Sequence, residues 1–183
     1  MQPCGVVQSV ELLLDGEAEN VILAEWRALQ AAGLPSQGRQ MAPSNRPHVT
    51  LVALDRIDPV AEPALLAAAT GVLPLQIRVG PLMVFGRGPH VLVRSVLATP
   101  GLLALQGALA AATGVPADST SAPGRWVPHV TLARRMTADQ VAAALAVLSA
   151  RIFPATAERM RRWDGSARRE WLVYPSEASN PAS

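Results

Sequence analysis

The chain contains the pentapeptide Pro47-His48-Val49-Thr50-Leu51 and repeats it, letter for letter, as Pro128-His129-Val130-Thr131-Leu132. The two copies hold two of the three histidines in the protein. They stand at matching places in the two halves of the chain, and an identity at matching places indicates an internal repeat.

The surrounding residues predict the same order of elements in both halves: strand, helix, loop, strand, helix, strand. In the first half, the apolar pattern predicts strands at 6–14, 47–54 and 75–82 and helices at 15–33 and 60–70. In the second half, it predicts strands at 90–97, 126–134 and 152–163 and helices at 99–114 and 137–148, with a further strand at 169–174. The strand at 75–82 is expected to be broken or bulged at Gly80–Pro81.

This repeat predicts two similar lobes that face each other across a shallow groove. The lobes are expected at about 6–85 and 89–174 of a single domain that spans residues 1–183, and the polar tail at 175–183 is expected to be mobile.

Composition limits the classes of protein that the chain can form. Half of its 183 residues are apolar, so it can bury a core. Its formal net charge is only +2, which does not favour nucleic acid binding, although a local arginine patch is compatible with it. A single cysteine, Cys4, excludes an intrachain disulfide. No apolar run is long enough for a membrane span and no signal peptide is recognised, so we expect a soluble, cytoplasmic monomer without membrane contact.

Each pentapeptide places a histidine and a threonine on the same side of a strand, because residues i and i+2 point to one face. His48 and Thr50 therefore project together, and so do His129 and Thr131, while the valine and leucine of each copy face a core. An approximate twofold axis between the lobes would bring the two pairs together across the groove.

Two imidazoles and two hydroxyls are suited to reaction at phosphorus. Histidines with a pKa of about 6.5 can serve as one neutral base and one protonated acid at neutral pH. Hydroxyls can donate hydrogen bonds to the non-bridging oxygens of a phosphate. A 2′,3′-cyclic phosphodiester fits such a site, because ring strain already lowers its barrier and no metal is needed. Neither pentapeptide contains a carboxylate or a thiol, so no metal site is expected.

The paired His-x-Thr motifs resemble those of the 2H phosphoesterase superfamily, and over about residues 6–174 the chain is similar to the 2′-5′ RNA ligase/RNA 2′,3′-cyclic phosphodiesterase group. The resemblance implies a bilobal α+β fold with two mostly antiparallel sheets facing across a central groove and the helices outside. It also implies cofactor-free hydrolysis of 2′,3′-cyclic phosphates on RNA ends or nucleotides, and in some members reversible 2′-5′ ligation. The residues at the motif positions are catalytic His48 and His129, with phosphate-binding Thr50 and Thr131.

The resemblance also points to Arg134 as a phosphate ligand, since the group often has an arginine there. Strand alternation by itself would place this side chain on the opposite face from His129. Three alternatives stay open: a module that binds a nucleotide or RNA end without turnover, an enzyme that joins 2′-5′ bonds, and a hydrolase of another cyclic phosphate.

Other conspicuous residues have simpler interpretations. His90 follows a glycine-rich turn and is expected to be solvated. Phe85 and Trp126 could line the groove or fill the core. The arginines at 159, 161, 162, 168 and 169 flank Trp163 and Trp171 and form either a solvated face or a surface that stacks on RNA. Cys4 lacks a basic neighbour and is not expected to be a nucleophile.

Overall fold

The computed structural model describes residues 7–175, and its elements follow the predicted repeat. The first half forms β1 (Gln8–Leu14), α1 (Gly16–Ala31), β2 (His48–Leu54), α2 (Glu62–Thr70) and β3 (Leu75–Phe85). The second half forms β4 (His90–Val96), α3 (Pro100–Thr113), β5 (His129–Met136), α4 (Ala138–Val147) and β6 (Phe153–Asp164), and β7 (Arg169–Tyr174) follows. Short 3₁₀ turns lie at η1 (Gln37–Arg39) and η2 (Pro59–Ala61). The predictions for Cys4 and for residues 176–183 lie outside the described residues.

The helices begin where the sequence provides capping groups. The side chains of Asp15 and Thr99 accept hydrogen bonds from the backbone at the starts of α1 and α3. Thr137 and Gln140 form the predicted capping box at the start of α4. Within residues 7–175, every helix is too short or too polar for a membrane span.

The α+β class and the antiparallel pairing are confirmed, but the expected pair of sheets is one continuous sheet. Its seven strands have the order β1-β2-β5-β4-β3-β6-β7, and β1 also pairs with β6. Long strands keep the sheet continuous. Strand β3, for example, pairs with β6 through residues 75–79 and mainly with β4 beyond them. The predicted bulge in β3 lies between Val79 and Leu82.

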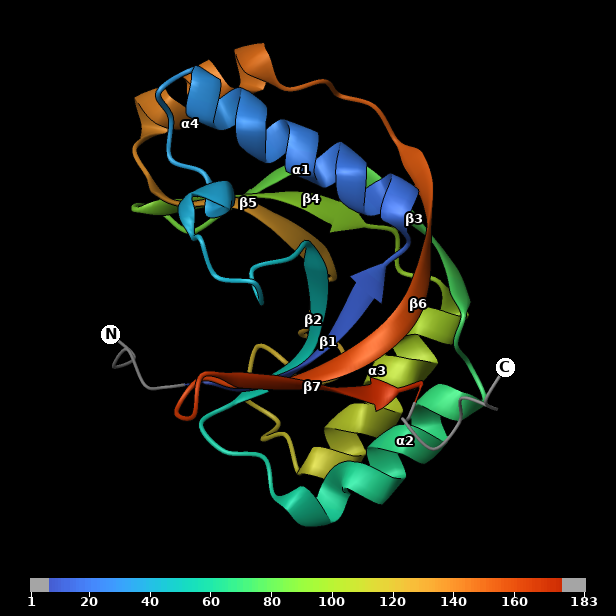
Figure 1. Cartoon of the computed structure of the whole chain (residues 1–183). Helices are drawn as coiled ribbons and strands as arrows, with labels where there is room; N and C mark the ends of the chain where they lie inside the picture. Colours follow the sequence, from blue (N-terminus) through green and yellow to red (C-terminus); the bar gives the residue numbers. More distant parts are fainter. Residues whose placement is uncertain (1–6, 176–183) are drawn as a thin grey trace.

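The division of the chain into lobes also differs from the prediction. Strand β6 belongs to the second half of the sequence, yet it pairs with β1 of the first half and carries β7 on its other side. Figure 1 shows β6 curving along the side of the molecule from the α4 region to β7. Each side of the molecule therefore combines elements from both sequence halves.

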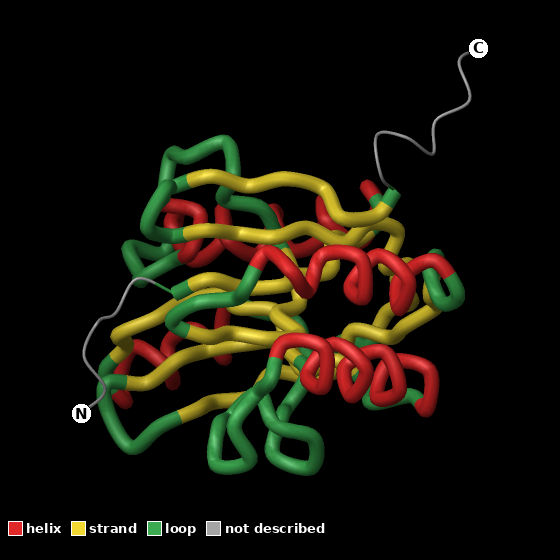
Figure 2. Tube along the Cα trace, turned by 90° about the horizontal axis from the view of Figure 1, so that it is seen from below, coloured by secondary structure: helices red, strands yellow, loops and turns green. Residues whose placement is uncertain are grey.

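The helices form two pairs outside the strands. Helix α1 packs against α4 and β5, whereas α2 packs against α3 and β7 (Figure 1). Figure 2 shows the strands running side by side across the molecule with the helices outside them. The core between these layers consists mainly of leucine, valine and alanine, with Ile22, Leu51, Leu65 and Leu132 among its fully buried residues.

A buried ion pair crosses the core between α1 and β4. Arg94 is fully buried, and its Nη2 lies 2.5 Å from Glu25 Oε1 while its Nε donates to Oε2 over 3.2 Å. The same guanidinium donates to the backbone carbonyls of Gly80, Ser149 and Arg151. One side chain thus connects α1, the β3 bulge and the segment after α4.

Candidate active site

The two His-x-Thr motifs lie side by side at the starts of β2 and β5. These strands run antiparallel, and Val49 of the first copy pairs with Val130 of the second. Equivalent residues pair with each other in this way where an approximate twofold axis passes between them. Both valines are fully buried in the core, so the residues next to them point to the opposite face of the sheet.

This register places all four predicted polar residues on one face. His48 lies across from Thr131, and Thr50 lies across from His129. Both histidines and Thr50 are half-buried, and Thr131 is 9% exposed. Among the described residues, neither threonine hydroxyl has a hydrogen-bond partner in the protein. The structure therefore brings the four predicted residues together.

The two histidines make the same contact with their own backbone. Nδ1 of His48 lies 2.6 Å from the Arg46 carbonyl, and Nδ1 of His129 lies 2.7 Å from the Val127 carbonyl. Because a carbonyl can only accept, each neutral ring carries its proton on Nδ1 and keeps a lone pair on Nε2. Both rings can thus use Nε2 to take up or release a proton.

The two Nε2 atoms have different surroundings. His48 Nε2 lies 3.6 Å from Oε1 of Glu11, a carboxylate on β1 that is only 5% exposed. Burial alone would raise the pKa of Glu11, but the charges of His48 and Arg161 and the hydrogen bonds from Ser9 and Arg161 lower it below its usual value. Glu11 is therefore ionised at neutral pH.

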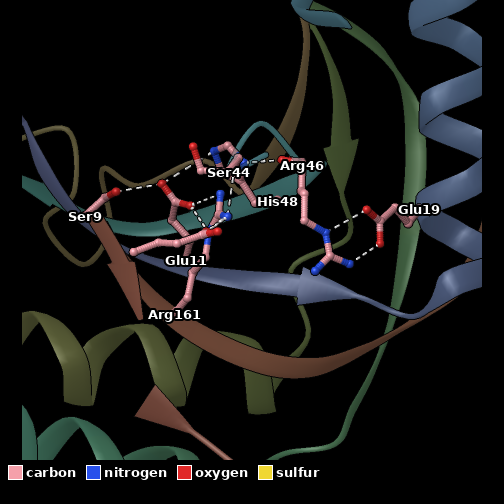
Figure 3. A network of polar contacts seen from close by, with 8 residues as sticks. Ser9, Glu11, Glu19, Ser44, Arg46, His48 and Arg161 are labelled. Atoms are coloured by element: carbon pink, nitrogen blue, oxygen red, sulfur yellow. Dashed lines mark hydrogen bonds and ion pairs between the residues drawn. The ribbon is translucent and has the colours of Figure 1, made fainter. Parts of the chain in front are cut away.

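Arg161 holds Glu11 in place (Figure 3). Its Nε donates to Glu11 Oε2 over 2.8 Å, and its Nη1 donates to the Ser44 carbonyl over 3.0 Å and forms an ion pair with Glu170. The network joins β1, β6, β7 and the loop before β2. Glu11 was not among the predicted site residues, and Arg161 was predicted only as part of the arginine group around Trp163 and Trp171. A single glutamate within the apolar β1 segment was an available signal for the carboxylate.

The loop before β2 is anchored a second time. Arg46, whose carbonyl contacts His48, donates from Nε and Nη2 to the two oxygens of Glu19 on α1 over 2.9 and 2.5 Å (Figure 3). Hydrogen bonding to Glu19 raises the pKa of Arg46, so the guanidinium stays charged. The backbone that orients His48 is thus connected directly to α1.

His129 lies in a more apolar environment. The Phe85 ring meets it edge-on, with centroids 4.9 Å apart and an interplanar angle of 76°. Burial lowers the pKa of His129, and the charges of Arg134 and His48 lower it further against the opposing hydrogen bond to Val127. His129 is therefore neutral at pH 7, and Phe85 belongs to the site.

Arg134 is exposed on β5, at a place where the pairing of β5 with β4 is irregular. The register shifts on both sides of Leu92, and the next residue, Arg135, has a positive φ of 57°. Simple strand alternation does not hold through such a bulge. The charge of Arg134 contributes to the lowered pKa of His129, and its role as a phosphate ligand stays a prediction.

Two tryptophans support the motif strands in a matching way. Trp26 Nε1 of α1 donates to the Thr131 carbonyl over 3.1 Å, and Trp126 Nε1 donates to the Thr50 carbonyl over 2.9 Å. Val49 and Val130 form the one residue pair between β2 and β5, so the indoles bind carbonyls close to the point where the two strands meet. Trp126, whose place the sequence left open, thus packs against the core and positions the motif.

The predicted arginine and tryptophan surface is divided between the two faces of the sheet. Arg161 points to the site, whereas the next residue, Arg162, forms an ion pair with Glu62 of α2 and lies 5.1 Å from the Trp171 ring. Alternation along β6 causes the division. Arg161 therefore lies apart from Arg162 and Arg169, which both lie against the Trp171 ring.

His90 is the half-buried first residue of β4 and contacts the carbonyl of Gly86 in the turn before that strand, so it is less solvated than predicted. Across residues 7–175, no group of three or more histidine, cysteine or acidic side chains is arranged to hold a metal ion.

The curled antiparallel sheet and the two opposed His-x-Thr strands define the chain as a protein of the 2H phosphoesterase type. The chain belongs to the 2′-5′ RNA ligase superfamily, because the family model of that description matches residues 16–161. The resemblance inferred from the motifs is thus confirmed, and the protein is an enzyme of phosphoesterase or ligase type.

Solved structures share this fold at low sequence identity. E. coli LigT complexed with 3′-AMP has a TM-score of 0.52 and 18% identity, and the match covers 92% of this chain and 98% of LigT. Usb1 of Kluyveromyces marxianus has a TM-score of 0.51 and 9% identity, with coverage of 91% and 97%. Among curated protein sequences, the chain has no significant match.

Proposed function

We propose that the protein is a metal-independent phosphodiesterase that hydrolyses the 2′,3′-cyclic phosphate of an RNA end or a nucleotide to a phosphomonoester. One observation carries the proposal: the pairing of Val49 with Val130 puts two imidazoles and two hydroxyls on one face. In both imidazoles Nδ1 is engaged by a backbone carbonyl, which leaves Nε2 for the substrate.

These groups account for every proton in the reaction. One histidine takes a proton from water as the water oxygen attacks phosphorus, and the other gives a proton to the ribose oxygen as its bond to phosphorus breaks. Thr50 and Thr131 donate hydrogen bonds to the non-bridging oxygens, where negative charge increases during attack. The two imidazoles thus supply both proton transfers, and the water needs no metal ion to activate it.

The relatives support a substrate of nucleotide size. E. coli LigT has been crystallised with 3′-AMP, and K. marxianus Usb1 with uridine monophosphate. A 3′-monophosphate is one of the two products that opening of a 2′,3′-cyclic phosphate can give. We therefore propose that the groove accepts a cyclic nucleotide or the terminal nucleotide of an RNA.

The first test is a substrate screen with EDTA present. We expect turnover of 2′,3′-cyclic AMP or of an oligonucleotide with a cyclic phosphate end, and a bell-shaped dependence of kcat/KM on pH. Because the pKa of His129 is lowered, the acidic limb should lie below pH 6.5, the ordinary histidine value. Binding without any product would favour the binding module, and product analysis would identify 2′-5′ joining or hydrolysis of a different cyclic phosphate.

The second test removes the hydroxyls without changing side-chain volume. Thr50→Val and Thr131→Val should each lower kcat/KM by about 10- to 100-fold, since a hydrogen bond to a charged group contributes roughly 1.5–3 kcal/mol. Thr70→Val is the matched control, because the Thr70 hydroxyl binds the Leu66 carbonyl within α2. Unchanged kinetics in both motif variants would show that the threonine hydroxyls do not bind the phosphate.

A further inference from the structure

One residue breaks the approximate symmetry between the two motifs. On the first motif, Glu11 of β1 pairs with Thr50; on the second, Val93 of β4 pairs with Thr131. Glu11 and Val93 therefore occupy equivalent positions beside equivalent threonines. A carboxylate lies next to His48, and a fully buried valine takes the corresponding place near His129.

Both oxygens of Glu11 are held by hydrogen bonds. Oε1 accepts from Ser9 Oγ over 2.6 Å, and Oε2 accepts from Arg161. The distance of 3.6 Å from Oε1 to His48 Nε2 exceeds a hydrogen bond. Glu11 can therefore attract the positive charge of a protonated His48 while the Nε2 proton stays available to a substrate.

Other charges around His48 are largely balanced. Arg46 is paired with Glu19, and Arg161 is paired with both Glu11 and Glu170. On the neighbouring strand β5, the charged and titratable groups are His129, Arg134 and Arg135, and both arginines are exposed. Within residues 7–175, Glu11 is the one acidic residue that forms an ion pair with His48.

We propose that Glu11 is a positioning residue that assigns the two histidine roles, with His48 as the general acid and His129 as the general base. This proposal rests on the proposed hydrolysis. His129, edge-on to Phe85 and without a carboxylate, stays neutral and can accept the proton of the attacking water on Nε2. His48 gives its Nε2 proton to the departing ribose oxygen. Solvent then returns both rings to their starting states.

The decisive variant is Glu11→Gln, which keeps the shape of the side chain and removes its charge. Ser9 can still donate to the amide oxygen, and Arg161 keeps Glu170 and Ser44. We expect the alkaline limb of kcat/KM to move to lower pH, with about a tenfold loss at pH 8 and little change on the acidic limb.

Glu170→Gln is the matched control, since it removes the other carboxylate from Arg161 and leaves Glu11 beside His48. Its alkaline limb should stay close to that of the wild type. If Glu11→Gln moves the acidic limb, or moves neither limb, the assignment is wrong.

Histidine ring titration by NMR tests Glu11 without any substrate. In the wild-type protein, the His129 ring should lose its proton below the ordinary histidine value of 6.5, and Glu11→Gln should change the His48 signals alone. A wild-type His129 ring that keeps its proton above pH 6.5 would overturn the assignment even if the variant does not fold. If the wild type hydrolyses no cyclic phosphate, the proposed function fails, and the titration still decides whether Glu11 and His48 are coupled.

The acid role has its own kinetic test. A nucleoside 2′,3′-cyclic phosphate with sulfur in place of the departing ribose oxygen has a leaving group that needs no proton. Such a substrate should restore most of the activity lost in His48→Ala and little of that lost in His129→Ala. Equal restoration in the two variants would contradict the division of roles.

Discussion

His48→Ala and His129→Ala should each lower kcat/KM for a 2′,3′-cyclic phosphate by about 10²- to 10⁴-fold in the presence of EDTA. This is the range of general acid–base catalysis by a positioned side chain. Each variant removes one of the two Nε2 atoms that the motif strands place on the same face. A chelator does not change the expected losses, because both proton transfers depend on imidazole.

His90→Ala is the matched control for these two variants. His90 contacts the Gly86 carbonyl in the turn before β4 and should be dispensable for activity. Because the two motif histidines act in one step, the double variant should lose far less than the product of the two single losses. If His129→Ala retains wild-type activity, the two-histidine mechanism is wrong.

Arg94→Met should lower the free energy of unfolding by about 3–5 kcal/mol, the usual effect of removing one partner of a buried ion pair. The substitution leaves the Glu25 carboxylate buried without its counter-charge. It also leaves the carbonyls of Gly80, Ser149 and Arg151 without the guanidinium that they bind. Urea unfolding followed by circular dichroism measures the change.

Two further variants separate the buried charge from other effects. Arg94→Met combined with Glu25→Leu should recover part of the loss, because no uncompensated charge then remains in the core. Arg46→Met, at the partly exposed pair with Glu19, should cost about 1 kcal/mol or less. If the double variant is less stable than Arg94→Met, Glu25 stabilises the fold by more than balancing the charge of Arg94.

Much of the fold was predictable because its signals are local. Alternating apolar residues, capping groups and turn-forming glycines specified the order of elements. The period of two residues in a strand was enough to place His48 with Thr50, and His129 with Thr131, on the side opposite the buried valines.

The pairing of distant strands was not predictable in the same way. The long β6 strand carries the second half of the chain across to β1, so the lobes do not coincide with the sequence halves. Bulges also change the local alternation, as at Arg134 in β5. A register between remote strands depends on the packing of both, which a single segment does not reveal.

By itself, the sequence determined the repeat, the α+β class and the two His-x-Thr pairs, because each is encoded within a few adjacent residues. Only the tertiary structure decided that Glu11 lies beside His48 while Val93 takes the equivalent place near His129. The reason is physical: the protonation of a half-buried imidazole depends on charges a few ångströms away in space, and these come from strands far apart along the chain.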